Sequence, residues 1–346
     1  MVSLLKQRKS DSFYIKKYDK ILIFLYIGNQ VIILIIQEEY MLRKLEPKGT
    51  IGVLAPAYPP NQKKLLSGIK YLKSKGFSVV EGASLKAKQG YFAGSDELRL
   101  EDLHQMYADP QIDLIICARG GWGTLRLLDK IDYDLIRNNP KLLVGYSDIT
   151  TLQLAFWAKA GIPSLSGPMV AVEMASGILS FTESYFWDVL FNEASHFSIP
   201  LDKDETVVWN EGQTEGLLLG GCLSLVTHQL GTPYNPDYSN AILFLEDVDE
   251  APYKIDRYLA QLKQAGILSQ IKGLILGNFI GCKPENNDTP SFTCEEVLHD
   301  YFAKATYPVI YNFPYGHGMR KISLPLGVKA WLDTEQRVLK VSNLFE

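Results

Sequence analysis

The stretch that decides the fold is KLLVGYSDITTL, residues 141–152. Its first half is an apolar run that ends at Gly145, and its second half has the composition of a helix that begins at once. A strand that turns directly into a helix is typical of parallel α/β sheets. A serine at such a turn, here Ser147, lies at the carboxyl edge of the sheet with its hydroxyl exposed. Gly145 relieves crowding at the turn.

The same alternation of strand and helix extends over the residues before this stretch. Short apolar runs predict strands, and apolar residues at a spacing of three and four predict helices. The predicted strands are 50–55, 77–80, 113–118 and 141–146, and the predicted helices are 62–75, 98–107, 124–130 and 149–161. This order predicts an α/β fold whose N-terminal domain, residues 45–170, is a mainly parallel, doubly wound sheet.

The regular alternation of strand and helix patterns ends after this domain. Residues 171–212 are aromatic-rich without a clear period, so we expect an irregular connecting segment or an active-site flap. Residues 213–346 carry less regular apolar runs, with a helix predicted around 223–230 and strands at 241–245, 273–277, 309–310 and 338–341. These predict a second domain with a mixed α+β or barrel-like architecture.

The first 44 residues form an extension with an open interpretation. An apolar run, residues 21–36, follows several lysines and arginines, as in a membrane anchor. The run is shorter than a bilayer span, and Gly28, Asn29 and Gln30 interrupt it. Its β-branched residues also fit a strand or a poorly ordered segment. We favour a functional chain that begins at Met41, and we expect no membrane partner.

The composition is that of a protein with two globular domains. Of 346 residues, 47% are apolar and 21% are charged. A formal net charge of −4 gives no basic face for a nucleic acid. The four scattered cysteines lack the spacing of a metal site and suit reduced thiols in the cytoplasm. We therefore expect neither a metal nor a cofactor.

A second glycine-rich motif, RGGWG at residues 119–123, follows the third predicted strand and reaches the same sheet edge as Ser147. Adjacent glycines let backbone amides approach a ligand closely. The amides of Gly121 and Asp148 can form an oxyanion hole. A phosphate loop is the rival interpretation, but the required glycine spacing and the Lys-Ser/Thr pair are missing. Arg119 either binds a substrate carboxylate or forms a surface salt bridge.

A nucleophilic serine needs a base and a group that orients the base. His317 stands between two glycines in a loop, and the other four histidines lie in contexts typical of solvated or structural residues. Glu246 ends the apolar strand that precedes it and is a candidate orienting carboxylate. From the residues alone, two non-catalytic interpretations stay open. Ser147 or Asp148 caps a helix, and Glu246 is a turn residue.

The chain resembles the LD-carboxypeptidases, a family of serine peptidases that also includes microcin-immunity hydrolases. The resemblance runs from about residue 48 to the end and rests on motifs in family order: RGGWG at 119–123, GYSD at 145–148, LGGCL at 219–223, LED at 245–247, PYKIDR at 252–257, GH at 316–317 and LPLG at 324–327. It implies a catalytic triad of Ser147, Glu246 and His317, with the last two supplied by the C-terminal domain. Cys222 and Trp122 depart from the family's usual Asn and Tyr.

The resemblance implies a metal-independent exopeptidase of the cytoplasm. Its substrate would be a muropeptide tetrapeptide, from which it releases terminal D-alanine during peptidoglycan recycling. An exopeptidase must recognise a free carboxylate, so we expect Arg119, Trp122 and Arg320 to line the substrate site, and a homodimer is possible. Two other functions stay open. One is an immunity-type amidase that stacks a nucleotide toxin on aromatic residues such as Trp187, and the other is a non-catalytic α/β protein that binds a small ligand.

Overall fold

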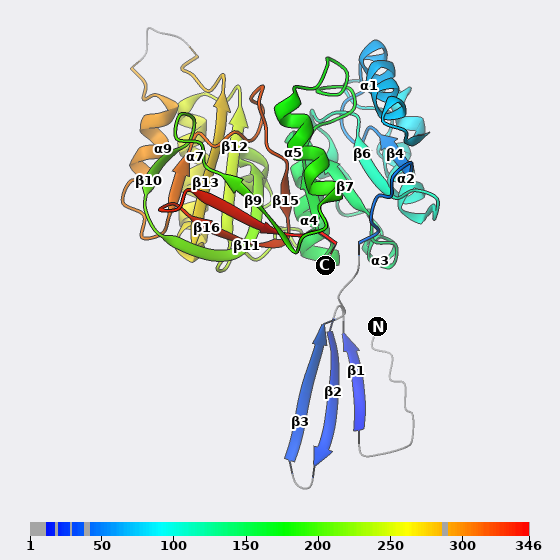
Figure 1. Ribbon diagram of the computed structural model, residues 1–346, viewed down its shortest axis with the longest axis horizontal. Coiled ribbons are helices and arrows are strands. Elements are labelled where there is room, and N and C mark those ends of the chain that lie inside the picture. Colours follow the sequence, from blue (N-terminus) through cyan, green and yellow to red (C-terminus); the bar gives the residue numbers. More distant parts are fainter. Residues whose placement is uncertain (1–11, 18–19, 28–29, 38–41, 286–289, 346) are drawn as a thin grey trace. The chain divides into compact units, whose positions relative to one another are not determined.

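The computed structural model describes residues 12–17, 20–27, 30–37, 42–285 and 290–345. The chain divides into two units, residues 1–41 and residues 42–346. The short first unit and the large second unit are separate bodies, and all the predicted site residues belong to the second (Figure 1).

The first unit is a three-stranded antiparallel sheet. Its strands are β1 (Ser12–Lys17), β2 (Lys20–Ile27) and β3 (Gln30–Gln37), paired in sequence order. The described residues of the apolar run at 21–36 thus belong to the antiparallel strands β2 and β3, in agreement with their β-branched composition. Among the described residues, no helix has both the length and the apolar character needed to cross a bilayer. The predicted start at Met41 lies outside the described residues.

A six-stranded sheet forms the first half of the second unit, in the order β15-β8-β7-β6-β4-β5. The strands β4 to β8 are parallel, which confirms the predicted mainly parallel sheet, although β8 was not predicted from the sequence. The strand β15 adds to β8 in the antiparallel sense. The strands are β4 (Thr50–Leu54), β5 (Ser78–Glu81), β6 (Leu114–Cys117), β7 (Leu142–Gly145), β8 (Ser164–Ser166) and β15 (Leu324–Leu326). The helices are α1 (Gln62–Ser74), α2 (Asp96–Ala108), α3 (Tyr133–Asn138) and α4 (Thr150–Ala160).

The helix predicted at 124–130 is wrong. The structure has only a single 3₁₀ turn, Thr124–Arg126, before α3 begins at its cap Asp132. Only eight residues lie between Gly123 and the next helix cap, Asp132, and so short a segment makes too few i→i−4 bonds to offset helix nucleation. Leu127 and Leu128 are buried in this turn segment. Their apolar spacing, which suggested a helix, therefore reflects burial in a turn.

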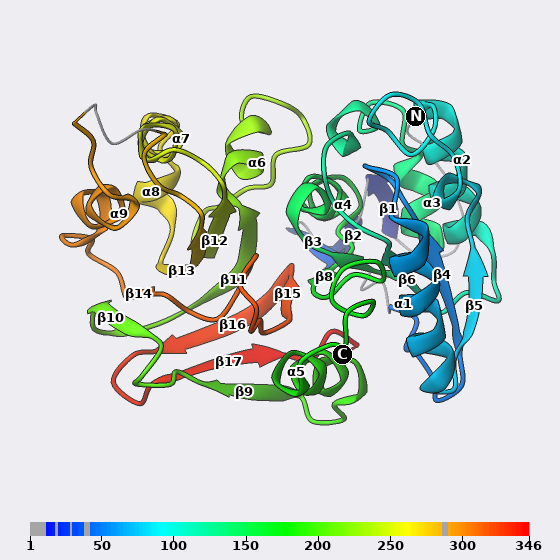
Figure 2. The same cartoon turned by 90° about the horizontal axis from the view of Figure 1, so that it is seen from above.

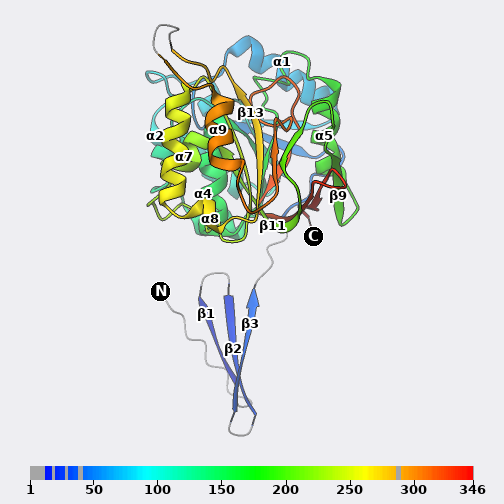
Figure 3. The same cartoon turned by 90° about the vertical axis from the view of Figure 1, so that its left-hand side faces the viewer.

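An eight-stranded mixed sheet forms the second half, in the order β10-β14-β13-β12-β11-β16-β17-β9. The strands β11 to β14 are parallel and the outer strands are antiparallel, which confirms the predicted mixed architecture. The helices α7 and α9 pack side by side against this sheet (Figure 3). The strands β16, β17 and β9 curl away from the helices, and the sheet stays open (Figure 2).

The bounds of the remaining elements complete this half. Its strands are β9 (His196–Pro200), β10 (Val207–Asn210), β11 (Gln213–Cys222), β12 (Ile242–Val248), β13 (Gly273–Ile280), β14 (Val309–Tyr311), β16 (Val328–Asp333) and β17 (Val338–Ser342). Its helices are α6 (Leu223–His228), α7 (Pro252–Gln264), α8 (Ile267–Gln270) and α9 (Cys294–Phe302).

The segment 171–212 is not irregular, contrary to the sequence expectation. It contains helix α5 (Ser180–Phe191) and supplies β9 and β10, the two outermost strands of the eight-stranded sheet. Its aromatic residues are packing residues. Trp187 stacks on Phe77 at 5.3 Å between ring centroids, and its indole N–H donates to Tyr71 Oη at 2.9 Å. Trp187 therefore packs α5 against Tyr71 of α1 and against Phe77, and Trp209 of β10 stacks on Tyr311 of β14.

Helix α1 approaches the segment after β8 at Gly68. A Cβ placed on Gly68 would lie 1.8 Å from the carbonyl oxygen of Val170. Gly→Ala inside a helix normally stabilises a protein by about 0.5–1 kcal/mol. Here we expect Gly68→Ala to lower the free energy of unfolding by about 1–3 kcal/mol, because the backbone of residue 170 must move.

Urea unfolding followed by circular dichroism measures this effect. Ser67→Ala, at the neighbouring exposed position, is the matched control and should change the unfolding free energy by less than about 0.5 kcal/mol. A Gly68→Ala variant as stable as the wild type would contradict the close approach of α1.

Candidate active site

Ser147 lies in a strained turn between β7 and α4. Its φ is +63°, a left-handed value that is uncommon for a residue with a side chain. Such strain is typical of a nucleophile held at a sharp strand-to-helix turn. The tightness of the turn requires the preceding glycine, because a Cβ on Gly145 would lie 2.9 Å from the Ile149 side chain. The turn predicted from the sequence is therefore present, with the predicted role for Gly145.

The glycine loop at 119–123 lies against Ser147. A Cβ on Gly120 would lie 2.9 Å from the Cβ of Ser147 and 3.3 Å from the amide nitrogen of Asp148. Within the described residues, the backbone amides of Gly121 and Asp148 donate no hydrogen bond. The Asp148 amide follows Ser147, and the Gly121 amide follows Gly120, so both are available to a negatively charged oxygen near the serine, and the N-terminus of α4 adds a favourable dipole.

The carboxylate of Asp148 and the guanidinium of Arg99 fix the backbone around this loop. Asp148 Oδ2 accepts from the Thr124 amide at 3.0 Å, and the Thr124 hydroxyl donates to the Asp148 carbonyl at 2.7 Å. Burial raises the pKa of the Asp148 carboxyl. Arg99 is fully buried and donates to the carbonyls of Pro56 and Gly123. These contacts hold the loops after β4, β6 and β7 in one arrangement.

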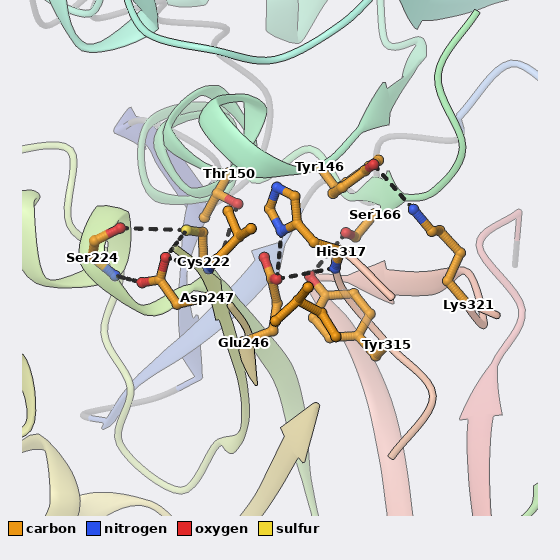
Figure 4. A network of polar contacts seen from close by, with 12 residues as sticks. Tyr146, Thr150, Ser166, Cys222, Ser224, Glu246, Asp247, Tyr315, His317 and Lys321 are labelled. Atoms are coloured by element: carbon orange, nitrogen blue, oxygen red, sulfur yellow. Dashed lines mark hydrogen bonds and ion pairs between the residues drawn. The ribbon is translucent and has the colours of Figure 1, made fainter. Parts of the chain in front are cut away.

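Glu246 and His317 form a direct pair. Glu246 is fully buried in β12, and its Oε2 accepts from His317 Nδ1 at 2.7 Å and from the His317 backbone amide at 3.2 Å (Figure 4). The close approach requires Gly316, whose φ is +102° and whose added Cβ would lie 2.5 Å from Glu246 Oε2. The carboxylate therefore fixes the imidazole with Nδ1 protonated and leaves Nε2 as the free acceptor.

The imidazole of His317 lies beside the turn that carries Ser147. Its ring contacts the ring of Tyr146 edge-on, with 5.0 Å between centroids. The imidazole stands between Glu246 and Tyr146, with its second nitrogen directed away from Glu246 (Figure 4). In the part of the chain that the structure describes, no hydrogen bond joins Ser147 Oγ to His317. The structure thus pairs Glu246 with His317 and brings both to the Ser147 turn, without the serine–histidine bond.

The three predicted substrate contacts differ in availability. The Arg119 guanidinium donates to the Gly120 carbonyl and lies 5.6 Å from the Tyr58 ring centroid, and no ion pair involves it among the described residues. Arg320 forms an ion pair with Glu205. Trp122 is half-buried in the glycine loop. Within the described ranges, Arg320 thus has a carboxylate partner and Arg119 has none.

The sequence reasoning missed a hydrogen-bond network behind Glu246. The Cys222 amide donates to Thr150 Oγ1 at 3.3 Å, and the Cys222 thiol donates to Asp247 Oδ1 at 3.3 Å (Figure 4). Asp247 Oδ2 accepts from the Ser224 amide at 2.8 Å. The network joins the helix that follows Ser147 to the strand that carries Glu246. The adjacency of two acidic residues in the LED motif was the available signal.

No group of three His, Cys, Asp or Glu side chains in the described ranges is arranged to hold a metal ion.

Comparisons with known proteins identify the family of the chain. Residues 51–167 match the LD-carboxypeptidase N-terminal domain, and residues 215–332 match the LD-carboxypeptidase C-terminal domain. The chain belongs to the LD-carboxypeptidase family. The two matched regions carry Ser147 on one side and Glu246 and His317 on the other.

Three members of this family illustrate the likeness. The probable murein peptide carboxypeptidase of Bacillus subtilis is 38% identical over 298 residues, which cover 86% of this chain and 93% of the relative. The crystal structure of muramoyltetrapeptide carboxypeptidase from Oxalobacter formigenes matches with a TM-score of 0.76 and 31% identity, covering 85% and 98% of the two chains. The microcin C7 self-immunity protein MccF of Escherichia coli is 27% identical, covering 86% and 93%.

Asp247 gives the site region a pH-dependent stability. Burial, and next the charge of Glu246, raise the pKa of Asp247 to about 6 from a model-peptide value of 3.8. A raised folded-state pKa stabilises the fold below pH 4, and that contribution is lost as the pH rises through 6. Asp247→Asn does not titrate. Relative to wild type, its free energy of unfolding should therefore gain up to about 3 kcal/mol between pH 4 and pH 7.5.

Urea unfolding of both proteins across this pH range measures the difference in slope. Parallel stability profiles for wild type and Asp247→Asn would refute the raised pKa of this carboxyl.

Proposed function

We propose that this member of the LD-carboxypeptidase family is a serine carboxypeptidase that releases terminal D-alanine from muropeptide tetrapeptides by hydrolysing an L,D-amide bond. The observation that carries the proposal is the buried Glu246–His317 hydrogen bond at the edge of the strained Ser147 turn. The muropeptide substrate is supported by relatives named as murein peptide and muramoyltetrapeptide carboxypeptidases.

The proposed reaction proceeds through an acyl-enzyme. Ser147 Oγ attacks the scissile carbonyl carbon while Nε2 of His317 takes the hydroxyl proton. Glu246 holds Nδ1 protonated and stabilises the imidazolium that forms. The imidazolium then gives its proton to the departing D-alanine amine. A water molecule attacks the ester carbonyl with His317 again as base. The imidazolium then returns the proton to Ser147 Oγ as the ester C–O bond breaks, and the shortened peptide leaves with a new carboxylate.

The amides of Gly121 and Asp148 receive the developing oxyanion in this mechanism. The Asp148 amide directly follows Ser147, and the Gly121 amide follows Gly120, which lies against Ser147. Neither amide has a backbone acceptor among the described residues. Arg119 binds the free carboxylate of the D-alanine, because its guanidinium has no acidic partner in the part of the chain described. Arg320 contributes less to this recognition than the sequence suggested, because Glu205 already pairs with it.

The immunity-type amidase is the second candidate, and the likeness to the microcin C7 self-immunity protein supports it. That function requires an exposed aromatic surface for a nucleobase. Trp187 does not offer one, because its ring stacks on Phe77 and Phe191. We therefore favour the muropeptide. Cleavage assays on a muropeptide tetrapeptide and on an aminoacyl sulfamoyl adenosine distinguish the two.

The setting of the proposed reaction follows from its substrate. Muropeptides that return from the cell wall are recycled in the cytoplasm, so we propose a cytoplasmic enzyme. A homodimer is part of the same proposal, and analytical ultracentrifugation at micromolar concentration tests it.

Ser147→Ala should abolish turnover. With the nucleophile removed, release of D-alanine should fall by at least about 10³-fold, while tetrapeptide binding by calorimetry stays near that of wild type. A fluorophosphonate probe should label the wild type and not the variant. A variant that keeps its turnover would exclude the acyl-enzyme. A wild type without turnover, whose ligand binding is unchanged by the substitution, would indicate a non-catalytic binding protein.

Glu246→Gln tests the orienting carboxylate. The amide can present its N–H group to Nδ1 and so favours the wrong tautomer, and kcat should fall by about 10²–10⁴-fold. Glu211→Gln, at an exposed turn between β10 and β11, is the control and should keep wild-type kcat. Equal kcat values for Glu246→Gln and Glu211→Gln would show that Glu246 is a turn residue only.

A further inference from the structure

A buried ion pair lies on the far side of Tyr146 from the reaction centre. Lys321 has a side chain only 6% exposed and forms an ion pair with Glu173, whose side chain is 12% exposed. The same ammonium donates to Tyr146 Oη at 3.0 Å and lies 4.1 Å from the centroid of that ring (Figure 4). Three chain segments far apart in the sequence meet in this cluster.

The three side chains of the cluster, Tyr146, Glu173 and Lys321, form a closed ring of polar contacts. Tyr146 Oη donates to Glu173 Oε1 at 2.7 Å, and Glu173 Oε2 accepts from the Met169 amide at 3.0 Å. Burial, and next the charge of Glu173, raise the pKa of the Tyr146 phenol, so the hydroxyl keeps its proton and remains a donor. The polar atoms of Tyr146, Glu173 and Lys321 are thereby bonded to one another rather than free to bind a ligand.

The cluster of Tyr146, Glu173 and Lys321 adjoins both Ser147 and His317. Tyr146 directly precedes Ser147, and its aromatic ring contacts the His317 imidazole edge-on. Lys321 lies four residues after His317 in the same loop. A buried contact therefore couples the residue before the nucleophile to the loop that carries the base.

The other end of the histidine loop is fixed as well. The hydroxyl of Tyr315, two residues before His317, lies 2.9 Å from Ser166 Oγ in β8. The Lys321 amide donates to Thr182 Oγ1 in α5 at 3.1 Å. The loop from Tyr315 to Lys321 is thus attached at both ends to residues outside the eight-stranded sheet.

We infer that Lys321, with Glu173, is a positioning residue for the reaction: it holds the Tyr146 ring against the His317 imidazole and so keeps Nε2 directed at the Ser147 turn. The inference rests on the proposed serine mechanism. Glu246 alone fixes one end of the imidazole, and a ring held at one nitrogen can still swing about the Nδ1–Oε2 bond. The edge of Tyr146 restricts that swing, and the ammonium restricts Tyr146.

A direct role for Lys321 on the substrate does not fit its surroundings. Its ammonium is buried and engaged by Glu173 and by Tyr146. Arg119, which has no acidic partner among the described residues, is the better candidate for a substrate carboxylate. The contribution of Lys321 is therefore geometric, and a misplacement of about 1 Å in such a site costs about 10²-fold in rate.

The test uses the intact protein and three variants. Lys321→Met removes the ammonium and keeps the side-chain length, and kcat should fall by about 10- to 100-fold with KM changed by less than about threefold. The second-order rate of fluorophosphonate labelling at Ser147 should fall by the same factor. Lys321→Met/Glu173→Gln removes both buried charges, so it should recover thermal stability but not kcat.

Lys141→Met is the matched control. Lys141 is a second buried lysine, and it donates to the carbonyls of Met106, Tyr107 and Asp109 at the opposite end of β7 from Ser147. It should lose stability and keep wild-type kcat per folded molecule.

The outcomes separate this inference from the proposed function. A wild type that resists the probe would overturn the serine mechanism and the inference with it. A wild type that is labelled, with Lys321→Met labelled at the same rate, would overturn the positioning role alone. Recovery of kcat together with stability in the double variant would likewise show that the ion pair acts only on folding.

Discussion

The hydrogen bond between the buried Glu246 carboxylate and His317 Nδ1 is the interaction on which the site depends. A carboxylate with no solvent exposure is costly to bury unless it is paired. The fold meets that requirement by pairing Glu246 of β12 with His317 and by using Gly316 to admit the histidine backbone. The strained Ser147 turn lies at the carboxyl end of a strand of the other sheet. The Glu246–His317 pair of the eight-stranded sheet therefore lies beside the Ser147 turn of the six-stranded sheet.

The local features of the fold could be predicted from the sequence because they depend on neighbouring residues. The strand-to-helix turn at Gly145 and Ser147 follows from an apolar run, a glycine and a helix start within a dozen residues. The pairing of Glu246 with His317 came from a motif resemblance, since 71 residues separate them and no periodicity links the two. The oxyanion and substrate contacts stay predictions.

The features that escaped prediction depend on long-range packing. The stretch at 124–130 has helical spacing, yet its leucines are buried around a single turn. The strands β9 and β10 come from a segment without alternation, because their place at the sheet edges is decided by β17 and β14. Glu173 and Lys321 carry no motif and lie 148 residues apart. A charged residue in an apolar pocket can be recognised only when the pocket is known.

The strand β15 has a consequence for the order in which the protein can be completed. It comes from residues 324–326 and covers the edge of β8, which would otherwise present unpaired backbone groups. During synthesis the strands β4 to β8 emerge early. The edge of β8 stays unpaired until residues 324–326, near the end of the polypeptide, have left the ribosome. Until then β8 is a template for pairing with other nascent chains. Because β15 closely follows His317 in the sequence, its pairing with β8 both protects that edge and fixes the histidine loop beside the Ser147 turn, so the site is assembled and the edge is covered together.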